Sequence, residues 1–173
     1  MPREGSRSAR SVFGPAWLSS LVRQRTDVAH MSDGPQDTWA LAQSSEQGTP
    51  VIWKILVDPP SFDIRIRYPW LTVISWKYRG ADTGMPSEEE NVRMMALEGV
   101  LQSGLEAEAV AMQFATRTGN RLKEFRYYST ERNVFIGRLN DVLRTPERYP
   151  IEIEFYHDPE WQNQANLISE IFK

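Results

Sequence analysis

Cysteine is absent from this chain of 173 residues, and histidine occurs only twice. Without thiols, the chain has no means of forming a disulfide, a thiolate metal site or a cysteine nucleophile. Long apolar runs are missing too, because residues 70–76 fall far short of the roughly 20 residues that a membrane-spanning helix requires. These absences predict a soluble protein with no membrane partner, and we expect it in the cytoplasm.

Sequence motifs of known reactions are also missing. Residues 80–84 contain two glycines, but no Lys-Ser/Thr pair follows them as it does in a phosphate-binding loop. Glu152 and Glu154 lie about 6 to 7 Å apart by strand rise, as in glycosidases, but their alternation with apolar residues is typical of an amphipathic strand. The glutamates at 88–90 diverge around a helix, so they do not converge on one cation. We therefore expect no cofactor, no metal and no catalytic residues.

The net charge of −3 is unevenly distributed. Residues 1–30 hold five arginines against Glu4 and Asp27, which gives them +3 and leaves −6 on the remainder. An acidic domain repels phosphate backbones unless its basic residues gather on one face. Nucleic acid is therefore not an expected partner.

Residues 1–49 are predicted to be a flexible leader, and residues 50–173 a single α+β domain. The first thirty residues are rich in Ser and Arg and contain Gly14-Pro15. Three interpretations remain open for them: translation that starts at Met31, a disordered terminus, or a targeting sequence. Between residues 36 and 49 we expect a polar tether with one short helical turn around Trp39.

Apolar residues recur at strand and helix intervals through the rest of the chain. Strands are predicted over residues 51–57, 62–68, 70–78, 109–116, 121–128 and 151–155. Helices are predicted from the capping box of Ser87 and Glu90 to Gly104, from the Thr130 cap to Arg144, and from the Asp158 cap to Phe172. The Gly119-Asn120 pair predicts a two-residue hairpin turn that places Phe114 opposite Phe125 and Gln113 opposite Arg126.

The elements from Trp70 to His157 follow the order βαββαβ. This order predicts a ferredoxin-like sandwich, with extra N-terminal strands and a C-terminal helix. Three short motifs support a family resemblance: Gly84-Met85-Pro86, the Thr118-Gly119 hairpin that leads to Tyr127-Tyr128, and Asp158-Pro159 followed by Trp161.

Through these motifs, roughly residues 50–173 resemble the bacterial Domain of Unknown Function 695 family. The resemblance implies no reaction. Some members look related to the regulator-of-ribonuclease-E type B domains, which share the closing Asp-Pro-x-Trp motif and act by binding proteins. This chain lacks an obvious long acidic tail, so a ribonuclease target is only an analogy.

The functional hypothesis concerns the sheet face opposite the two main helices. Alternation predicts that this face is polar and mixed in sign, with Ser75, Lys77, Gln113, Arg117, Glu124, Arg126, Tyr128, Glu152, Glu154 and Tyr156. The predicted binding residues are Lys77, Gln113, Glu124, Arg126, Tyr128 and Tyr156, and the expected partner is another protein or a second copy of the chain. The alternative is a plain solvated face, or one covered by residues 51–68 and the last helix.

We therefore expect a bacterial protein-binding or regulatory module rather than an enzyme. A second hypothesis is a small-molecule-binding domain or small enzyme that uses Glu124, Arg126 and His157. A third is an immunity or antitoxin-type partner, which the sequence does not distinguish from the first.

Overall fold

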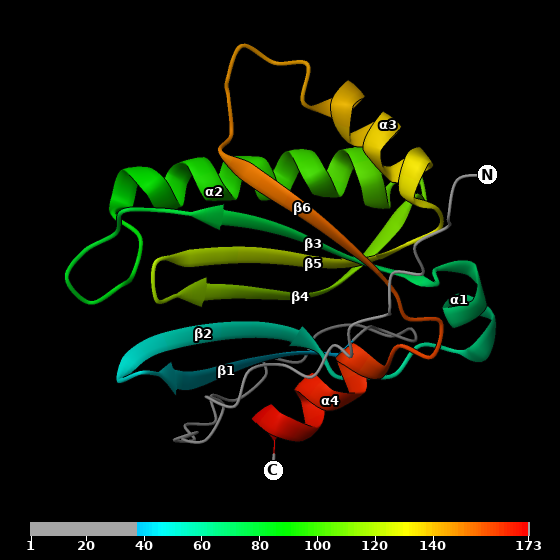
Figure 1. The fold of residues 1–173 in the computed structure, drawn as a ribbon, viewed down its shortest axis with the longest axis horizontal. Helices are drawn as coiled ribbons and strands as arrows, with labels where there is room; N and C mark the ends of the chain where they lie inside the picture. The colour runs from blue at the N-terminus through cyan, green and yellow to red at the C-terminus, as the bar shows by residue number, and fades with distance from the viewer. Residues whose placement is uncertain (1–37, 173) are drawn as a thin grey trace, which may run out of the picture.

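The computed structural model describes residues 38–172, which form an α+β domain (Figure 1). Its antiparallel sheet contains β1 (Trp39–Glu46), β2 (Thr49–Leu56), β3 (Trp70–Lys77), β4 (Ala111–Gly119), β5 (Leu122–Ser129) and β6 (Ile151–His157), in the order β1-β2-β4-β5-β3-β6. The helices are α1 (Phe62–Arg67), α2 (Glu88–Leu101), α3 (Arg132–Val142) and α4 (Gln162–Ile171), and a π-helical turn, η1 (Gln102–Glu106), continues α2. Expectations for residues 1–37 lie outside this range.

Two apolar clusters lie on the two faces of the sheet. Helices α2 and α3 cover one face, where Met94, Leu97 and Leu139 pack with sheet residues such as Phe125. Helix α4 covers part of the other, where Leu167 packs with residues of β2, β3 and β4. We call these the α2/α3 face and the α4 face. No helix within residues 38–172 has the length and apolar character needed to cross a bilayer.

The tether expected before residue 50 is wrong for its described part, because residues 39–46 form strand β1. A two-residue turn, Gln47-Gly48, joins β1 to β2, and both turn residues have positive φ (51° and 79°). Turns of this kind match the twist of a hairpin. The polar composition of β1 concealed the strand, whereas the Xaa-Gly turn was a signal for it.

The strand predicted over residues 62–68 is also wrong, because the segment forms helix α1. The Ser61 side chain caps it by accepting a hydrogen bond from the Ile64 amide at 3.4 Å. Phe62 and Ile66 are exposed, one helical turn apart. A short run of alternating apolar and polar residues is compatible with the two-residue period of a strand and with the 3.6-residue period of a helix. Here the serine cap, which follows two prolines, favours the helix.

The predicted register of the β4–β5 hairpin is wrong. The turn is Asn120-Arg121, with φ of 49° and 59°, so Gly119 pairs with Leu122 and Thr116 pairs with Phe125. The register then shifts at a bulge between Gln113 and Ala115. A bulge inserts one extra residue and changes which side chains share a face.

The predicted helix end at Gly104 is wrong as well, because η1 carries the chain past it. A Cβ atom added to Gly104 would lie 2.1 Å from Val142 Cγ1 in the segment that ends α3. Gly104 therefore permits a close approach of the two helical segments rather than ending one. The predicted cap of α3 also differs, since the Thr130 hydroxyl donates to the Val110 carbonyl and Glu131 takes the cap position.

The predicted capping box of α2 is confirmed. The Ser87 hydroxyl accepts from the Glu90 amide at 3.2 Å, and the Glu90 carboxylate accepts from the Ser87 amide at 2.8 Å. Burial opposes ionisation of Glu90, but hydrogen bonds from the backbone amides of Ser87, Gly80 and Arg79 outweigh it, so the pKa of Glu90 is lower than usual.

Glu90→Gln is expected to lower the free energy of unfolding by about 1 kcal/mol at neutral pH, since a neutral amide accepts these hydrogen bonds less strongly. A depressed carboxyl pKa stabilises the fold above the unfolded-state value, 4.5, and this contribution is lost as the pH falls through the folded-state pKa. Urea denaturation at several pH values should therefore show the difference from wild type shrinking in acid. Glu89→Gln is the matched control, and an equal loss in that variant would contradict the role of Glu90.

Candidate functional site

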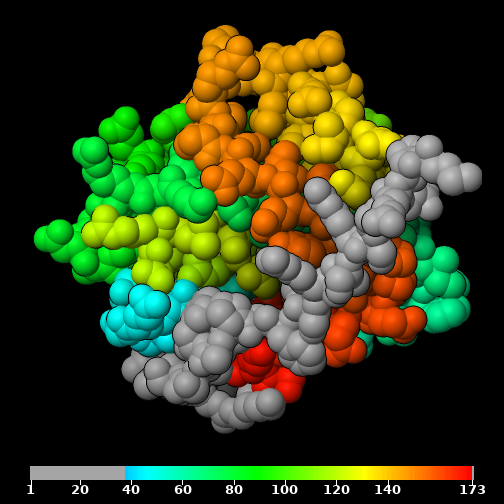
Figure 2. Space-filling model, in the orientation of Figure 1, coloured from blue at the N-terminus to red at the C-terminus, as the bar shows by residue number. Residues whose placement is uncertain are grey.

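Strand pairing places most of the predicted polar residues on the α4 face. One row crosses five strands and contains Trp53, Arg117, Glu124, Ser75 and Glu152. The next row contains Ile55, Ala115, Arg126, Val73 and Glu154. Atoms of β6 (orange) and of the β4–β5 hairpin (yellow-green) lie at the surface in Figure 2. The sequence pattern therefore placed Glu124 and Arg126 of β5, Ser75 of β3, and Glu152 and Glu154 of β6 on the same face, as the structure does.

Arg126 and Glu124 form the centre of this surface. The Arg126 guanidinium donates to Glu124 Oε2 through Nη2 at 2.7 Å and through Nε at 3.1 Å. It also lies 5.0 Å from the centre of the Trp53 ring. The Arg126 and Glu124 side chains are 19% and 14% exposed, so water reaches both charges only in part. Two hydrogen bonds and the ring contact hold the guanidinium in one orientation.

The pairs near the β6 edge are more exposed. Lys77 Nζ lies 2.9 Å from Glu152 Oε2, and these side chains are 71% and 67% exposed. The Tyr156 hydroxyl donates to Glu154 Oε2 at 3.1 Å. Burial, followed by this bond to Glu154, raises the pKa of the Tyr156 phenol. Exposed ion pairs contribute little to stability, so they can exchange partners at low cost.

Arg117 belongs to the same row but is not accessible. Its guanidinium forms an ion pair with Glu46 of β1, with Nε donating to Glu46 Oε1 at 3.2 Å and Nη2 donating to Glu46 Oε2. Its Nη1 also donates to the Gly119 and Leu122 carbonyls, both at 3.4 Å. Both side chains of the pair are buried. Arg117 therefore links β4 to β1 across β2. The sequence pattern did not indicate that Arg117 pairs with Glu46.

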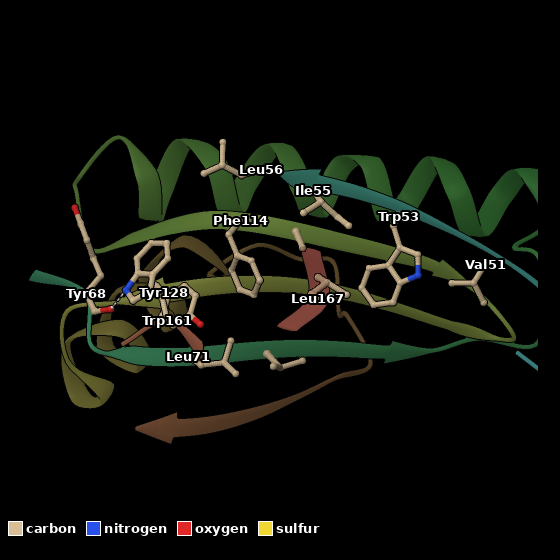
Figure 3. Close-up of a cluster of buried hydrophobic side chains, with 12 residues drawn as sticks. Val51, Trp53, Ile55, Leu56, Tyr68, Leu71, Phe114, Tyr128, Trp161 and Leu167 are labelled. Atoms are coloured by element: carbon tan, nitrogen blue, oxygen red, sulfur yellow. Dashed lines mark hydrogen bonds between the residues drawn. The ribbon is translucent and has the colours of Figure 1, made fainter. Parts of the chain in front are cut away.

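Tyr128 lies on the α4 face, but α4 covers it. Its ring stacks on Trp161 with centroids 3.8 Å apart and an interplanar angle of 10°, and its hydroxyl donates to Asp158 Oδ2 at 2.7 Å. Burial, followed by the hydrogen bond to Asp158, raises the pKa of the Tyr128 phenol. Figure 3 shows the two rings side by side, with the Trp161 indole bonded to the Tyr68 carbonyl. Tyr128 is therefore not available to a partner.

Gln113 does not share this face, contrary to the expectation. Its side-chain amide donates to the Tyr127 hydroxyl at 3.2 Å, and Tyr127 belongs to the cluster of the α2/α3 face. The β4 bulge causes the difference, because Phe114 and Ala115 both join the cluster on the α4 face. Of the six predicted binding residues, the structure leaves Lys77, Glu124, Arg126 and Tyr156 together on the uncovered part.

The three residues of the small-enzyme hypothesis are not brought together. His157 pairs with Trp70 and follows Phe155, which lies on the α2/α3 face, and its ring is 4.8 Å from the Trp70 ring. Glu124 and Arg126 lie on the opposite face. Asp158, beside His157, accepts from the amides of Gln162 and Asn163 at 2.9 Å each, although the predicted cap position is wrong, because α4 begins at Gln162 and Trp161 is its N-cap residue. Within residues 38–172, no group of three His, Asp or Glu is placed to hold a metal ion.

The structure also brings together a charged cluster that the sequence pattern did not single out. Lys123 is buried on the α2/α3 face, where its Nζ donates to Thr118 Oγ1 at 3.1 Å and lies 3.7 Å from Glu98. Lys54 Nζ lies 3.9 Å from the same carboxylate. Burial lowers the pKa of Lys123, and Glu98 opposes this shift. The arrangement gives the buried Lys123 ammonium a hydrogen bond and a counter-charge. It does not place an acid and a base around a cavity, as a catalytic site would require.

An open recess of about 380 Å³ lies near this cluster, between β2, β4 and the start of α2. Ile52, Pro86 and Asn91 are among its lining residues. None of the predicted site residues lines it. The recess therefore does not connect the predicted polar surface to an enclosed reaction site.

The sequence model of a family described as "Family of unknown function (DUF695)" matches residues 37–166. No curated protein and no solved structure matches the chain. The matched range begins two residues before β1 and ends within α4, so it covers all six strands.

Proposed function

The chain belongs to the DUF695 family, whose function is unknown, and from this premise we propose that it is a bacterial, non-catalytic protein-binding module. The observation that carries the proposal is the group Glu124, Arg126 and Tyr156 on the uncovered part of the α4 face, beside the buried Trp53. Arginine, tryptophan and tyrosine dominate the binding energy of protein interfaces. Here an oriented, partly desolvated guanidinium lies 5.0 Å from the centre of the buried Trp53 ring, and Tyr156 adds a phenol to the same face.

The pairs around this centre suit the same role. Protein interfaces commonly have a drier centre and a polar rim that stays in contact with water. Arg126 and Glu124 fit the centre, and the exposed Lys77–Glu152 pair fits the rim. A partner with its own charged pair would exchange ion pairs at the rim and would bury the Arg126 side chain further. We therefore place the partner's footprint over β5, β3 and β6.

We propose that the scaffold is a ferredoxin-like sheet with part of one face free for binding. Four strands, in the order β4-β5-β3-β6, come from the segment with the element order βαββαβ, and α2 and α3 lie on one face. This order supports a ferredoxin-like topology. Strands β1 and β2 and helix α4 would then be additions that extend the sheet and cover one end of its second face.

A charge exchange tests the proposed surface. The double variant Glu124→Arg/Arg126→Glu retains one acid and one base but reverses their positions. We expect it to reduce partner recovery at least roughly tenfold, since truncating a hot-spot arginine at an interface costs about 2 kcal/mol or more. The measurement is quantitative affinity purification from the native host, with thermal unfolding as a check that the variant folds.

The matched control is the same exchange at Asp141 and Arg144, an exposed pair at the end of α3. It should leave the recovered partners unchanged. If the central exchange impairs folding, Lys77→Glu/Glu152→Lys tests the rim of the same surface without disturbing the core. Identical partners and yields for wild type and a folded surface variant would remove this face from consideration.

A further inference from the structure

Among residues 38–172, no strand pairs with the outer hydrogen-bonding edge of β1. The Val57 amide donates to the Thr38 carbonyl, which fixes the phase of the β1–β2 ladder. In an antiparallel ladder, every second residue bonds to its neighbour and the others point away. The amides and carbonyls that point away from β2 are those of Trp39, Leu41, Gln43 and Ser45. Within residues 38–172, no backbone hydrogen bond joins them to another segment.

The two edges of the sheet differ in their protection against pairing. Natural sheets guard an open edge with charges, prolines or bulges. On β6, Glu152 and Glu154 are exposed, and Pro150 precedes the strand. Strand β1 has no charged residue or proline from Trp39 to Ser45, and its register with β2 is regular. The single charge of β1, Glu46, is paired with Arg117.

The side chains next to the β1 edge are apolar and exposed. Leu41 is 58% exposed, and Ile52, which lies diagonally from it on β2, is 43% exposed. Both lie on the α2/α3 face, since Leu41 pairs with Lys54, which contacts Glu98 of α2. An unguarded edge beside exposed apolar side chains is typical of a surface that another strand covers.

We propose that β1 pairs in the antiparallel direction with β1 of a second copy, so that two six-stranded sheets join across a two-fold axis. With the axis at Ala42, Leu41 of each copy faces Gln43 of the other, and Trp39 faces Ser45. All four outward residues then find a backbone partner, which is the self-complementarity that a two-fold interface requires. This inference is independent of the binding surface on the α4 face.

Charge favours a second copy at this edge. Each chain carries a net charge of −3, so two copies repel each other, and a neutral contact surface avoids adding close like-charge pairs to that repulsion. The same antiparallel arrangement on β6, centred on Ile153, would set Glu152 against Glu154 of the other copy. On β1 no charge faces another. The neutral edge is therefore suited to self-pairing, and the acidic edge is not.

The first test measures the mass of the full chain in solution by analytical ultracentrifugation over a concentration series. We expect the wild type to reach twice the 20.0 kDa of one chain. Leu41→Lys should weaken self-association at least roughly tenfold, because it places two like charges beside the axis and each 1.4 kcal/mol is a factor of ten. Val92→Lys is the matched control, since Val92 is an equally exposed apolar residue on α2, and it should leave the mass unchanged.

The second test measures the hydrogen-exchange rates of the backbone amides along β1. In the dimer, the amides of Leu41 and Gln43 should exchange slowly, and they should become fast on dilution or in Leu41→Lys. The amides of Ala40 and Ala42, which bond to β2, should stay protected in every case. A wild type that remains monomeric at high concentration overturns the proposal and leaves a strand of a different protein as the occupant of this edge. A dimer in which Leu41 and Gln43 exchange rapidly overturns it as well.

Discussion

Trp161→Ala is expected to lower the free energy of unfolding by about 3 to 5 kcal/mol, the range for removing a large buried aromatic side chain. Trp161 is 2% exposed, its ring stacks on Tyr128, and its indole donates to the Tyr68 carbonyl at 2.9 Å. Alanine removes the stacking contact, leaves that carbonyl without its partner and opens a cavity beneath the start of α4. Urea denaturation monitored by circular dichroism measures the loss.

Two further variants separate the contributions of Trp161. Trp161→Phe keeps an aromatic ring against Tyr128 but removes the donor to Tyr68, so we expect a smaller loss than with alanine. Phe172→Ala removes an exposed aromatic residue at the end of the same helix and should change stability by only about 0.5 kcal/mol. Equal effects of Trp161→Ala and Phe172→Ala would show that Trp161 does not anchor α4.

The role of Trp161 explains one motif of the family resemblance. The Asp158 carboxylate accepts hydrogen bonds from the first two amides of α4 and from the Tyr128 hydroxyl, and Trp161 stacks on the same tyrosine. Gln164 adds a hydrogen bond to the Leu56 carbonyl at 2.9 Å. The Asp-Pro-x-Trp motif therefore fastens α4 to the sheet. Proteins that share this motif therefore share the attachment of α4 to the sheet, and the motif by itself does not indicate a common function. Binding residues must be sought on the surface that α4 leaves uncovered.

The strands and helices with strong periodicity could be predicted from the sequence. Alternation placed Glu124 and Arg126 on one face together with Glu152 and Glu154, and the capping box placed the start of α2. These predictions succeeded because each signal is local: a side chain bonds to an amide three residues away, or apolar residues repeat at the period of one element.

Several errors arose where distant residues decide the structure, whereas the Ser61 cap of α1 and the Gln47-Gly48 turn were local signals. The bulge in β4 moves Gln113 to the other face, and nothing in the neighbouring residues marks it. The polar strand β1 is held by pairing with β2 and by the Glu46–Arg117 ion pair, which joins residues far apart in the chain. Tyr128 has the alternation of an exposed residue, but α4 returns to cover it. Tertiary contacts of this kind override local pattern.

Arg117→Met is expected to lower the free energy of unfolding by about 3 to 5 kcal/mol, because it leaves the Glu46 carboxylate buried without its counter-charge. The Gly119 and Leu122 carbonyls lose a donor in the same variant. The cost follows from desolvation: a buried carboxylate loses its hydration on folding, and within residues 38–172 the cation paired with Glu46 is Arg117. Chemical denaturation at neutral pH measures the loss.

The double variant Glu46→Met/Arg117→Met should recover much of that stability, since an apolar pair of similar volume carries no desolvation penalty. The coupling between the two positions, read from the double-mutant cycle, should therefore be large. Lys77→Met provides the control at an ion pair that is exposed on both sides, and we expect a change of less than about 1 kcal/mol there. If Arg117→Met and Lys77→Met cost the same, the Glu46–Arg117 pair does not hold β1 to the sheet. Loss of the pair would then leave β1, and the edge it presents to a second copy, intact.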